Sequence, residues 1–122
     1  ALPVKRGSSQ ISAIRKIMKL LGSEIVMLFP EGTRSKTGEL GKGKRMLGRL
    51  LLDAKPVVVP VRIFGAEKIL GVGEKRPRLF HKIELKFGPP LDLEKYYSNG
   101  NNRKELSQKI TTKVMEAISA IH

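Results

Sequence analysis

The sequence of 122 residues contains no cysteine and no tryptophan, and it has only two histidines. The lack of cysteine excludes a disulfide scaffold, cysteine-ligated metal sites and a cysteine nucleophile, and it fits a reducing compartment. The two histidines, His81 and His122, are too few for a multi-histidine cage, so we predict no metal site. No segment approaches the roughly 20 consecutive apolar residues that cross a bilayer.

Acidic and aromatic residues are also scarce. Lys and Arg number 24 against 11 Asp and Glu, giving a net charge of +13, and aromatic residues make up only 5% of the chain. Such a surface attracts phosphate groups, whether on nucleic acid, on anionic lipid headgroups or on a phosphorylated substrate. The small aromatic content disfavours base stacking, and no pattern of a known RNA- or DNA-binding module is present. A nucleic-acid-binding module is therefore the less favoured alternative, and we expect no nucleic acid partner.

Helical and strand-like patterns alternate along the chain. Apolar residues at helical spacing predict three amphipathic helices, from Ile11 to Leu21, from Lys44 to Ala54 and from Arg103 to the C-terminus. Apolar runs predict four strands, near Leu2–Val4, Ile25–Phe29, Val57–Ile63 and Ile83–Phe87. This order is typical of an α/β fold, a three-layer domain whose largely parallel central sheet is flanked by helices.

The segment "LFPEGTRSKTGELGKGKR", from Leu28 to Arg45, is the first candidate site. Its Gly38, Gly43 and Lys44 satisfy the spacing of a nucleotide-binding P-loop. However, Arg45 stands where a P-loop needs serine or threonine to hold magnesium, and the preceding apolar run ends well before Gly38. The sequence therefore disfavours a P-loop. A plainer interpretation of "SKTGELGKG" is a solvated connection in which Thr33 or Ser35 caps a turn.

The order Glu31, Gly32, Thr33, Arg34 after an apolar run is more specific than a surface connection requires. Gly32 allows the backbone to approach a ligand, so that loop amides donate to anionic oxygens. The Arg34 guanidinium suits bidentate binding of a phosphate, and Thr33 adds a hydroxyl donor. Glu31 suits acceptance of a hydrogen bond from a substrate hydroxyl, or orientation of the arginine. Loops of this kind at the carboxyl ends of strands bind ligands in α/β domains, and these groups suit a phosphorylated polyol.

Four segments together carry a family resemblance. "FPEGTRS", Phe29 to Ser35, resembles the third sequence block of the glycerolipid acyltransferase family, which includes the lysophosphatidic acid acyltransferases. "LPVKRG" resembles the second block, an apolar strand ending in a basic residue, here Arg6. "VVVPVRI" resembles the fourth block, with Pro60 at its centre, and "IELKFGPPLDL" resembles the strand and turn that follow. Their order and spacing agree with the family over nearly the whole chain.

The resemblance implies an acyltransferase of phospholipid biosynthesis. Such an enzyme binds no cofactor and transfers an acyl group from an acyl-CoA or acyl-carrier-protein thioester to the free hydroxyl of lysophosphatidic acid. It also implies the site residues: Arg6, Glu31, Gly32, Thr33 and Arg34 bind the acceptor, and Val59 and Pro60 support the acyl or acceptor pocket. The acyl-chain length, the choice of thioester and the choice between glycerol phosphate and its monoacyl form stay open.

A lipid acceptor implies a membrane-associated protein on the cytoplasmic face. The basic stripe formed by Lys42, Arg45 and Arg49 is either a solvated helix face or a contact with anionic lipid headgroups.

The sequence departs from the family in one respect. The catalytic block of the family, His-x-x-x-x-Asp, precedes the second block, and this sequence begins at the second block with Ala1. His81 does not replace it, because the residue five positions later is Lys86 and not an acid. We therefore expect residues 1–122 to be the C-terminal portion of a single acyltransferase domain, with no catalytic residue in this chain. The alternative function is a non-catalytic domain that binds phosphate or anionic lipid.

Overall fold

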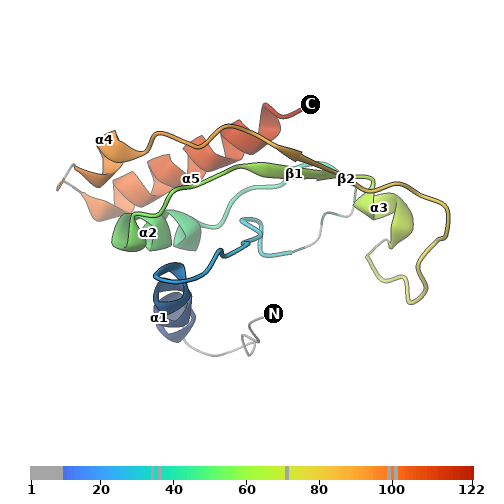
Figure 1. Cartoon of the computed structure of the whole chain (residues 1–122), viewed down its shortest axis with the longest axis horizontal. Helices are drawn as coiled ribbons and strands as arrows, with labels where there is room; N and C mark the ends of the chain where they lie inside the picture. The colour runs from blue at the N-terminus through green and yellow to red at the C-terminus, as the bar shows by residue number, and fades with distance from the viewer. Residues whose placement is uncertain (1–9, 34, 36, 71, 99, 101) are drawn as a thin grey trace.

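The computed structural model describes residues 10–33, 35, 37–70, 72–98, 100 and 102–122 (Figure 1). The elements are α1 (Gln10–Leu21), α2 (Arg45–Ala54), β1 (Val61–Phe64), α3 (Ala66–Ile69), β2 (Glu84–Phe87), α4 (Glu94–Tyr97) and α5 (Arg103–Ser119). The predicted α/β class and the three predicted amphipathic helices are confirmed, the helices as α1, α2 and α5. The single-turn helices α3 and α4 are not predicted by the sequence, because four residues are too few to show a helical period.

The main core lies where α2 packs against α5. Its buried members are Leu51, Leu52, Leu93, Leu106, Ile110, Val114 and Ile118. The two helices approach so closely at Gly48 that a Cβ atom there would lie 1.8 Å from the carbonyl oxygen of Ser107. At the same point the Gly48 N–H donates a hydrogen bond of 3.1 Å to Thr111 Oγ1. The close packing of α2 on α5 therefore depends on the absence of a side chain at Gly48 and on the buried hydroxyl of Thr111.

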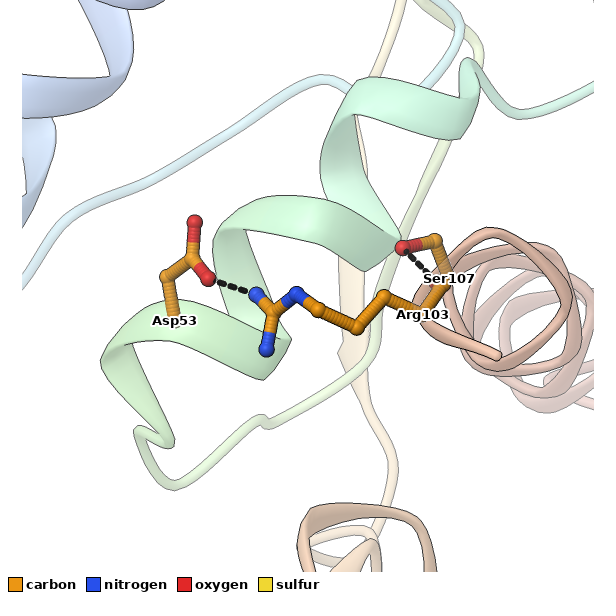
Figure 2. A network of polar contacts seen from close by, with 3 residues as sticks. All are labelled: Asp53, Arg103 and Ser107. Carbon is orange, nitrogen blue, oxygen red and sulfur yellow. Dashed lines mark hydrogen bonds and ion pairs between the residues drawn. The ribbon is translucent and has the colours of Figure 1, made fainter. Parts of the chain in front are cut away.

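An ion pair at the surface joins the same two helices. Figure 2 shows the Arg103 side chain reaching from α5 to the carboxylate of Asp53 on α2. The Ser107 hydroxyl donates to the Arg103 carbonyl oxygen at 2.7 Å, within α5. Because the Arg103 side chain is largely exposed, solvent screens this pair, and it contributes less than the apolar contacts beneath it.

A second, smaller cluster attaches α1 to the other side of α2. Ile14 and Ile17 of α1 are buried against Leu50 of α2, and the partly buried Leu21 and Val26 complete the cluster. The helix therefore buries one apolar face, as its sequence period predicts.

The prediction of a largely parallel sheet is wrong for the strands that the structure describes. β1 and β2 form a two-stranded antiparallel pair, in which Val61 faces Phe87 and Phe64 faces Glu84. The physical reason lies in the connection between them. A parallel pair needs a crossover, usually a long helix, that returns the chain to the same end of the sheet. Here the connection holds only the single turn of α3 and a loop, and the chain reverses direction (Figure 1).

The prediction of a buried strand at Ile25–Phe29 is also wrong. The segment has no strand pairing among the described residues, Ile25 is fully exposed and Phe29 is 66% exposed. An apolar run becomes a buried strand only where a neighbouring strand accepts its backbone hydrogen bonds, and β1 and β2 pair with each other instead. The strands predicted at Val57–Ile63 and Ile83–Phe87 are confirmed in part by β1 and β2, and Leu2–Val4 lies outside the described residues.

Candidate functional site

An apolar groove of about 1130 Å³ lies between the unpaired segment 24–33 and the segment 56–63 that leads into β1. Leu47, Leu50 and Leu51 of α2 and Val114 and Ile118 of α5 complete its lining from the core side. Small-molecule sites are concave and mostly apolar, with a few polar groups that orient the ligand. The groove therefore has the character of a site for a largely apolar ligand.

Five residues singled out from the sequence line this groove together. Glu31, Gly32 and Thr33 come from one wall, and Val59 and Pro60 come from the other. Gly32 and Thr33 are exposed, whereas Pro60 is buried, so polar groups at the surface adjoin an apolar interior. The other two predicted site residues, Arg6 and Arg34, lie outside the described residues, and their roles stay predictions.

A tight turn shapes the polar wall of the groove. The Gly32 N–H donates to the carbonyl oxygen of Phe29 at 3.0 Å, and Gly32 has a left-handed backbone with φ of +70°. Glycine adopts this conformation without steric cost. A Cβ atom at Gly32 would meet only side-chain carbons of Lys44 at 3.7 Å, so the requirement for glycine is conformational and does not come from crowding.

The same turn is joined to the start of α2. The Lys44 N–H donates to the carbonyl oxygen of Pro30 at 2.8 Å. This bond places Lys44 next to the turn, and its side-chain carbons approach Gly32. Lys42, Arg45 and Arg49 of the predicted stripe are all exposed.

Glu31 has a partner that the sequence does not predict. Its Oε2 atom accepts a hydrogen bond of 2.8 Å from the backbone N–H of Gly41. A Cβ atom at Gly41 would lie 2.6 Å from this oxygen, so a side chain there would push the carboxylate from its present position. Glu31 thus closes the loop between the turn and α2. The glycine-rich composition of "GELGKG" is the only signal of this contact in the sequence, and it is equally typical of a flexible connection.

The loop beyond the turn contains local hydrogen bonds from hydroxyl side chains. Ser35 Oγ accepts from the Thr37 N–H at 3.3 Å, and Thr37 Oγ1 accepts from the Glu39 N–H at 3.3 Å. Bonds two residues apart are those by which Ser and Thr stabilise turns. They support the plainer interpretation for this part of the segment, as a structured turn.

The described part of the chain brings no histidine to the groove. His81 is exposed and precedes β2, which begins only at Glu84. The backbone oxygen of His122 accepts a hydrogen bond from Lys86 Nζ at 2.9 Å, at the C-terminal end of the chain. Over the described ranges, no three Asp, Glu or His side chains gather in a way that could hold a metal ion.

The helices of the described ranges are all too short or too polar to span a bilayer.

Comparison with known proteins gives three results. Residues 1–64 match the sequence profile of the Acyltransferase family. Over 77 residues the chain is 36% identical to a chloroplastic 1-acyl-sn-glycerol-3-phosphate acyltransferase of Arabidopsis thaliana and 35% identical to one of Brassica napus. Each alignment covers 61% of this chain but only 22% of the relative, so the chain spans less than a quarter of the relatives that it matches. Among solved structures, none matches the chain.

Proposed function

Since the chain belongs to the acyltransferase family, we propose that it forms part of an enzyme that acylates the free hydroxyl of lysophosphatidic acid. The acceptor is suggested by the relatives, which are named as 1-acyl-sn-glycerol-3-phosphate acyltransferases. The observation that carries the proposal is the meeting of Glu31, Gly32 and Thr33 with Val59 and Pro60 around one apolar groove.

The groove suits an amphiphilic acceptor. Lysophosphatidic acid has one acyl chain and one charged head, and the groove has an apolar interior adjoining a polar turn. Its volume of about 1130 Å³ exceeds the roughly 300–1,000 Å³ of ordinary small-molecule sites, as a long ligand requires. We infer that the acyl chain lies beside Val59 and Pro60, and that the glycerol phosphate lies at Gly32 and Thr33.

Two arginines complete the proposed acceptor site. In the family pattern Arg6 and Arg34 stand where the phosphate binds, and a guanidinium is the side chain best suited to bidentate contact with phosphate oxygens. The net charge of +13 supports an anionic ligand. In this proposal Glu31 holds the loop that carries Thr33 and Arg34, through its bond to Gly41.

We propose that the general base is contributed by protein sequence outside residues 1–122. The acceptor hydroxyl must lose a proton as it attacks the thioester carbonyl, and in the family a His-x-x-x-x-Asp pair takes that proton. The donor is an acyl-CoA or acyl-carrier-protein thioester, which leaves as a free thiol. The chain alone would then bind the acceptor without turnover.

The site of action follows from the substrate. The acceptor and the product are both lipids, so we propose a membrane-associated protein that works at an anionic surface on the cytoplasmic face. The absence of cysteine is compatible with a reducing compartment.

The test is acyl transfer by the whole protein with the Arg34→Ala variant. Loss of a charge-assisted hydrogen bond costs roughly 1.5–3 kcal/mol, which lowers kcat/KM for lysophosphatidic acid about 10- to 100-fold. Arg34→Lys should restore only part of this, because an ammonium cannot span two phosphate oxygens. Monoacylglycerol, which lacks the phosphate, is the control acceptor. An equal loss with both acceptors would contradict the proposed phosphate role.

A further inference from the structure

The loop of residues 72–82, between α3 and β2, exposes apolar and basic side chains side by side. Phe80 is fully exposed and Leu79 is 74% exposed. The same loop contains four basic residues, Lys75, Arg76, Arg78 and Lys82, and one acidic residue, Glu74. Figure 1 shows it as the yellow segment that extends beyond the end of the sheet, away from α2, α4 and α5.

Several contacts fix the shape of this loop. The Arg78 N–H donates to the carbonyl oxygen of Ile69 at 2.7 Å, and its guanidinium pairs with Glu74 at 2.6 Å. At the base of the loop, Gly65 packs against the backbone of Lys82. A Cβ atom at Gly65 would lie only 2.3 Å from the Lys82 carbonyl oxygen, so a side chain there would prevent this close approach. The loop is thus held at its base and at Arg78, directly before Leu79 and Phe80.

Phe80 has a left-handed backbone, with φ of 71°. This conformation is a genuine outlier for a bulky side chain. Here it coincides with complete exposure of the ring. Such outliers gather at functional positions, and an aromatic ring held in water gains nothing from folding.

We propose that the loop 72–82 is a membrane-docking element, which inserts Leu79 and Phe80 among the headgroups of an anionic phospholipid bilayer. The apolar pair would enter the boundary between headgroups and acyl chains, where aromatic rings are favoured. The basic side chains would remain at the negatively charged surface. A nucleic acid would complement the basic residues but would leave the two apolar side chains without a role, so lipid is the better match.

The loop also adjoins the candidate site. Ile69 and Leu70 before it and Ile83 after it line the apolar groove. Docking would therefore hold the groove at the bilayer, where a lipid acceptor could enter without crossing water. This link to the acceptor rests on the function proposed above, whereas the docking itself does not.

The first test is sedimentation of the 122-residue chain with vesicles of phosphatidylcholine, with and without phosphatidylglycerol. We expect binding that requires phosphatidylglycerol. The double variant Leu79→Ser/Phe80→Ser should lower the partition coefficient at least about tenfold, because two apolar side chains no longer leave water. The matched control is Ile11→Ser, which removes an exposed apolar side chain from α1 and should leave binding unchanged.

The charge test compares two triple variants that lose the same net charge. Lys75→Gln/Arg76→Gln/Lys82→Gln should weaken binding about fivefold for each charge removed. Lys16→Gln/Lys104→Gln/Lys113→Gln removes three exposed lysines from α1 and α5 and should weaken it far less. An equal effect of the two sets would contradict docking through this loop.

A spectroscopic test does not depend on the amount bound. The chain has no tryptophan, so Phe80→Trp introduces a single reporter. Its fluorescence should shift to the blue on phosphatidylglycerol vesicles and be quenched by brominated acyl chains. Tyr96→Trp on α4 is the control and should show neither change.

The proposal would also be overturned by fluorescence of the Phe80→Trp variant that vesicles leave unaffected, or by parental binding of the Leu79→Ser/Phe80→Ser variant. Binding to duplex DNA without binding to vesicles would overturn it in favour of nucleic acid. The vesicles contain no lysophosphatidic acid and no thioester, so this result is independent of the acceptor. If the chain docks on vesicles but does not bind lysophosphatidic acid, the result contradicts the proposed function and leaves the docking proposal intact.

Discussion

Glu31 Oε2 accepts a hydrogen bond of 2.8 Å from the backbone N–H of Gly41, ten positions along the chain. The two residues flank the loop that carries Thr33, and both the turn at Gly32 and the start of α2 adjoin it. The Glu31 carboxylate therefore holds the two ends of this loop together. Any ligand binding by the loop depends on the conformation that this hydrogen bond stabilises.

Glu31→Ala should loosen this loop. Loss of the hydrogen bond is worth about 0.5–1.5 kcal/mol, so hydrogen exchange at the Gly41 amide should accelerate about two- to tenfold. Glu31→Gln keeps a side-chain oxygen that can accept the bond and should retain most of the protection. Glu39→Ala, in the same exposed loop, is the control. Unchanged exchange at Gly41 in the alanine variant would show that the bond does not hold the loop in solution.

Gly48→Ala should destabilise the chain through a backbone clash. The new Cβ atom would lie 1.8 Å from the Ser107 carbonyl oxygen, so α2 and α5 would have to move apart. Overpacking of this kind costs about 1–3 kcal/mol, and the shift also strains the Gly48 bond to Thr111.

Urea denaturation monitored by circular dichroism checks this. Gly22→Ala is the matched control, because a Cβ atom there would meet only the Lys19 carbonyl oxygen, at an ordinary 3.6 Å. Equal midpoints for the two variants would contradict the packing of α2 on α5.

The Tyr97 hydroxyl should lose its proton at a higher pH than the hydroxyl of an unperturbed tyrosine. Burial, aided by the negative charge of Glu94, raises the pKa of Tyr97 from 10.0 to about 12. The folded state thus favours the neutral phenol, whose hydroxyl donates to the Pro56 carbonyl oxygen at 3.3 Å. The stabilisation from this preference is complete below about pH 10, the pKa of an unperturbed tyrosine, and is lost as the pH rises from 10 to about 12.

The chain has two tyrosines, so ultraviolet absorbance of Tyr96→Phe reports Tyr97 alone. The expected midpoint is about 12. Tyr97→Phe should also lose less stability than the parent over the same alkaline range. A Tyr97 midpoint near the unperturbed value of 10.0 would show that the ring is more solvated than the structure has it.

The sequence predicts the helices of this fold well and the sheet poorly, for a physical reason. Ile14 and Ile17 of α1 recur at helical spacing, and a helix satisfies its own backbone hydrogen bonds. A strand depends on a neighbour, which no local pattern supplies. The apolar run at Ile25–Phe29 therefore has the pattern of a buried strand, although it lies unpaired and exposed.

The candidate site likewise has a part that the sequence predicts and a part that it does not. Gly32, Thr33, Val59 and Pro60 are predictable from motifs, and the structure brings them to one groove. The contact between Glu31 and Gly41 is not predictable, because a side chain bound to a backbone amide ten positions away leaves no periodic signal. The exposed apolar pair in the loop 72–82 is not predictable either. An aromatic residue is expected to be buried and to have a negative φ, whereas Phe80 is exposed and has a positive φ.

The central claim is that the turn at Gly32 and the groove at Val59 form one site for a phosphorylated, acylated acceptor. Nuclear magnetic resonance titration of the 122-residue chain with monomeric lysophosphatidic acid tests it most directly. The amide signals of Gly32 and Val59 should shift together and saturate at the same ligand concentration. Monoacylglycerol should still shift Val59, through the acyl chain, while the Gly32 signal stays in place. A Gly32 signal that ignores lysophosphatidic acid, or that responds equally to both lipids, would contradict the account.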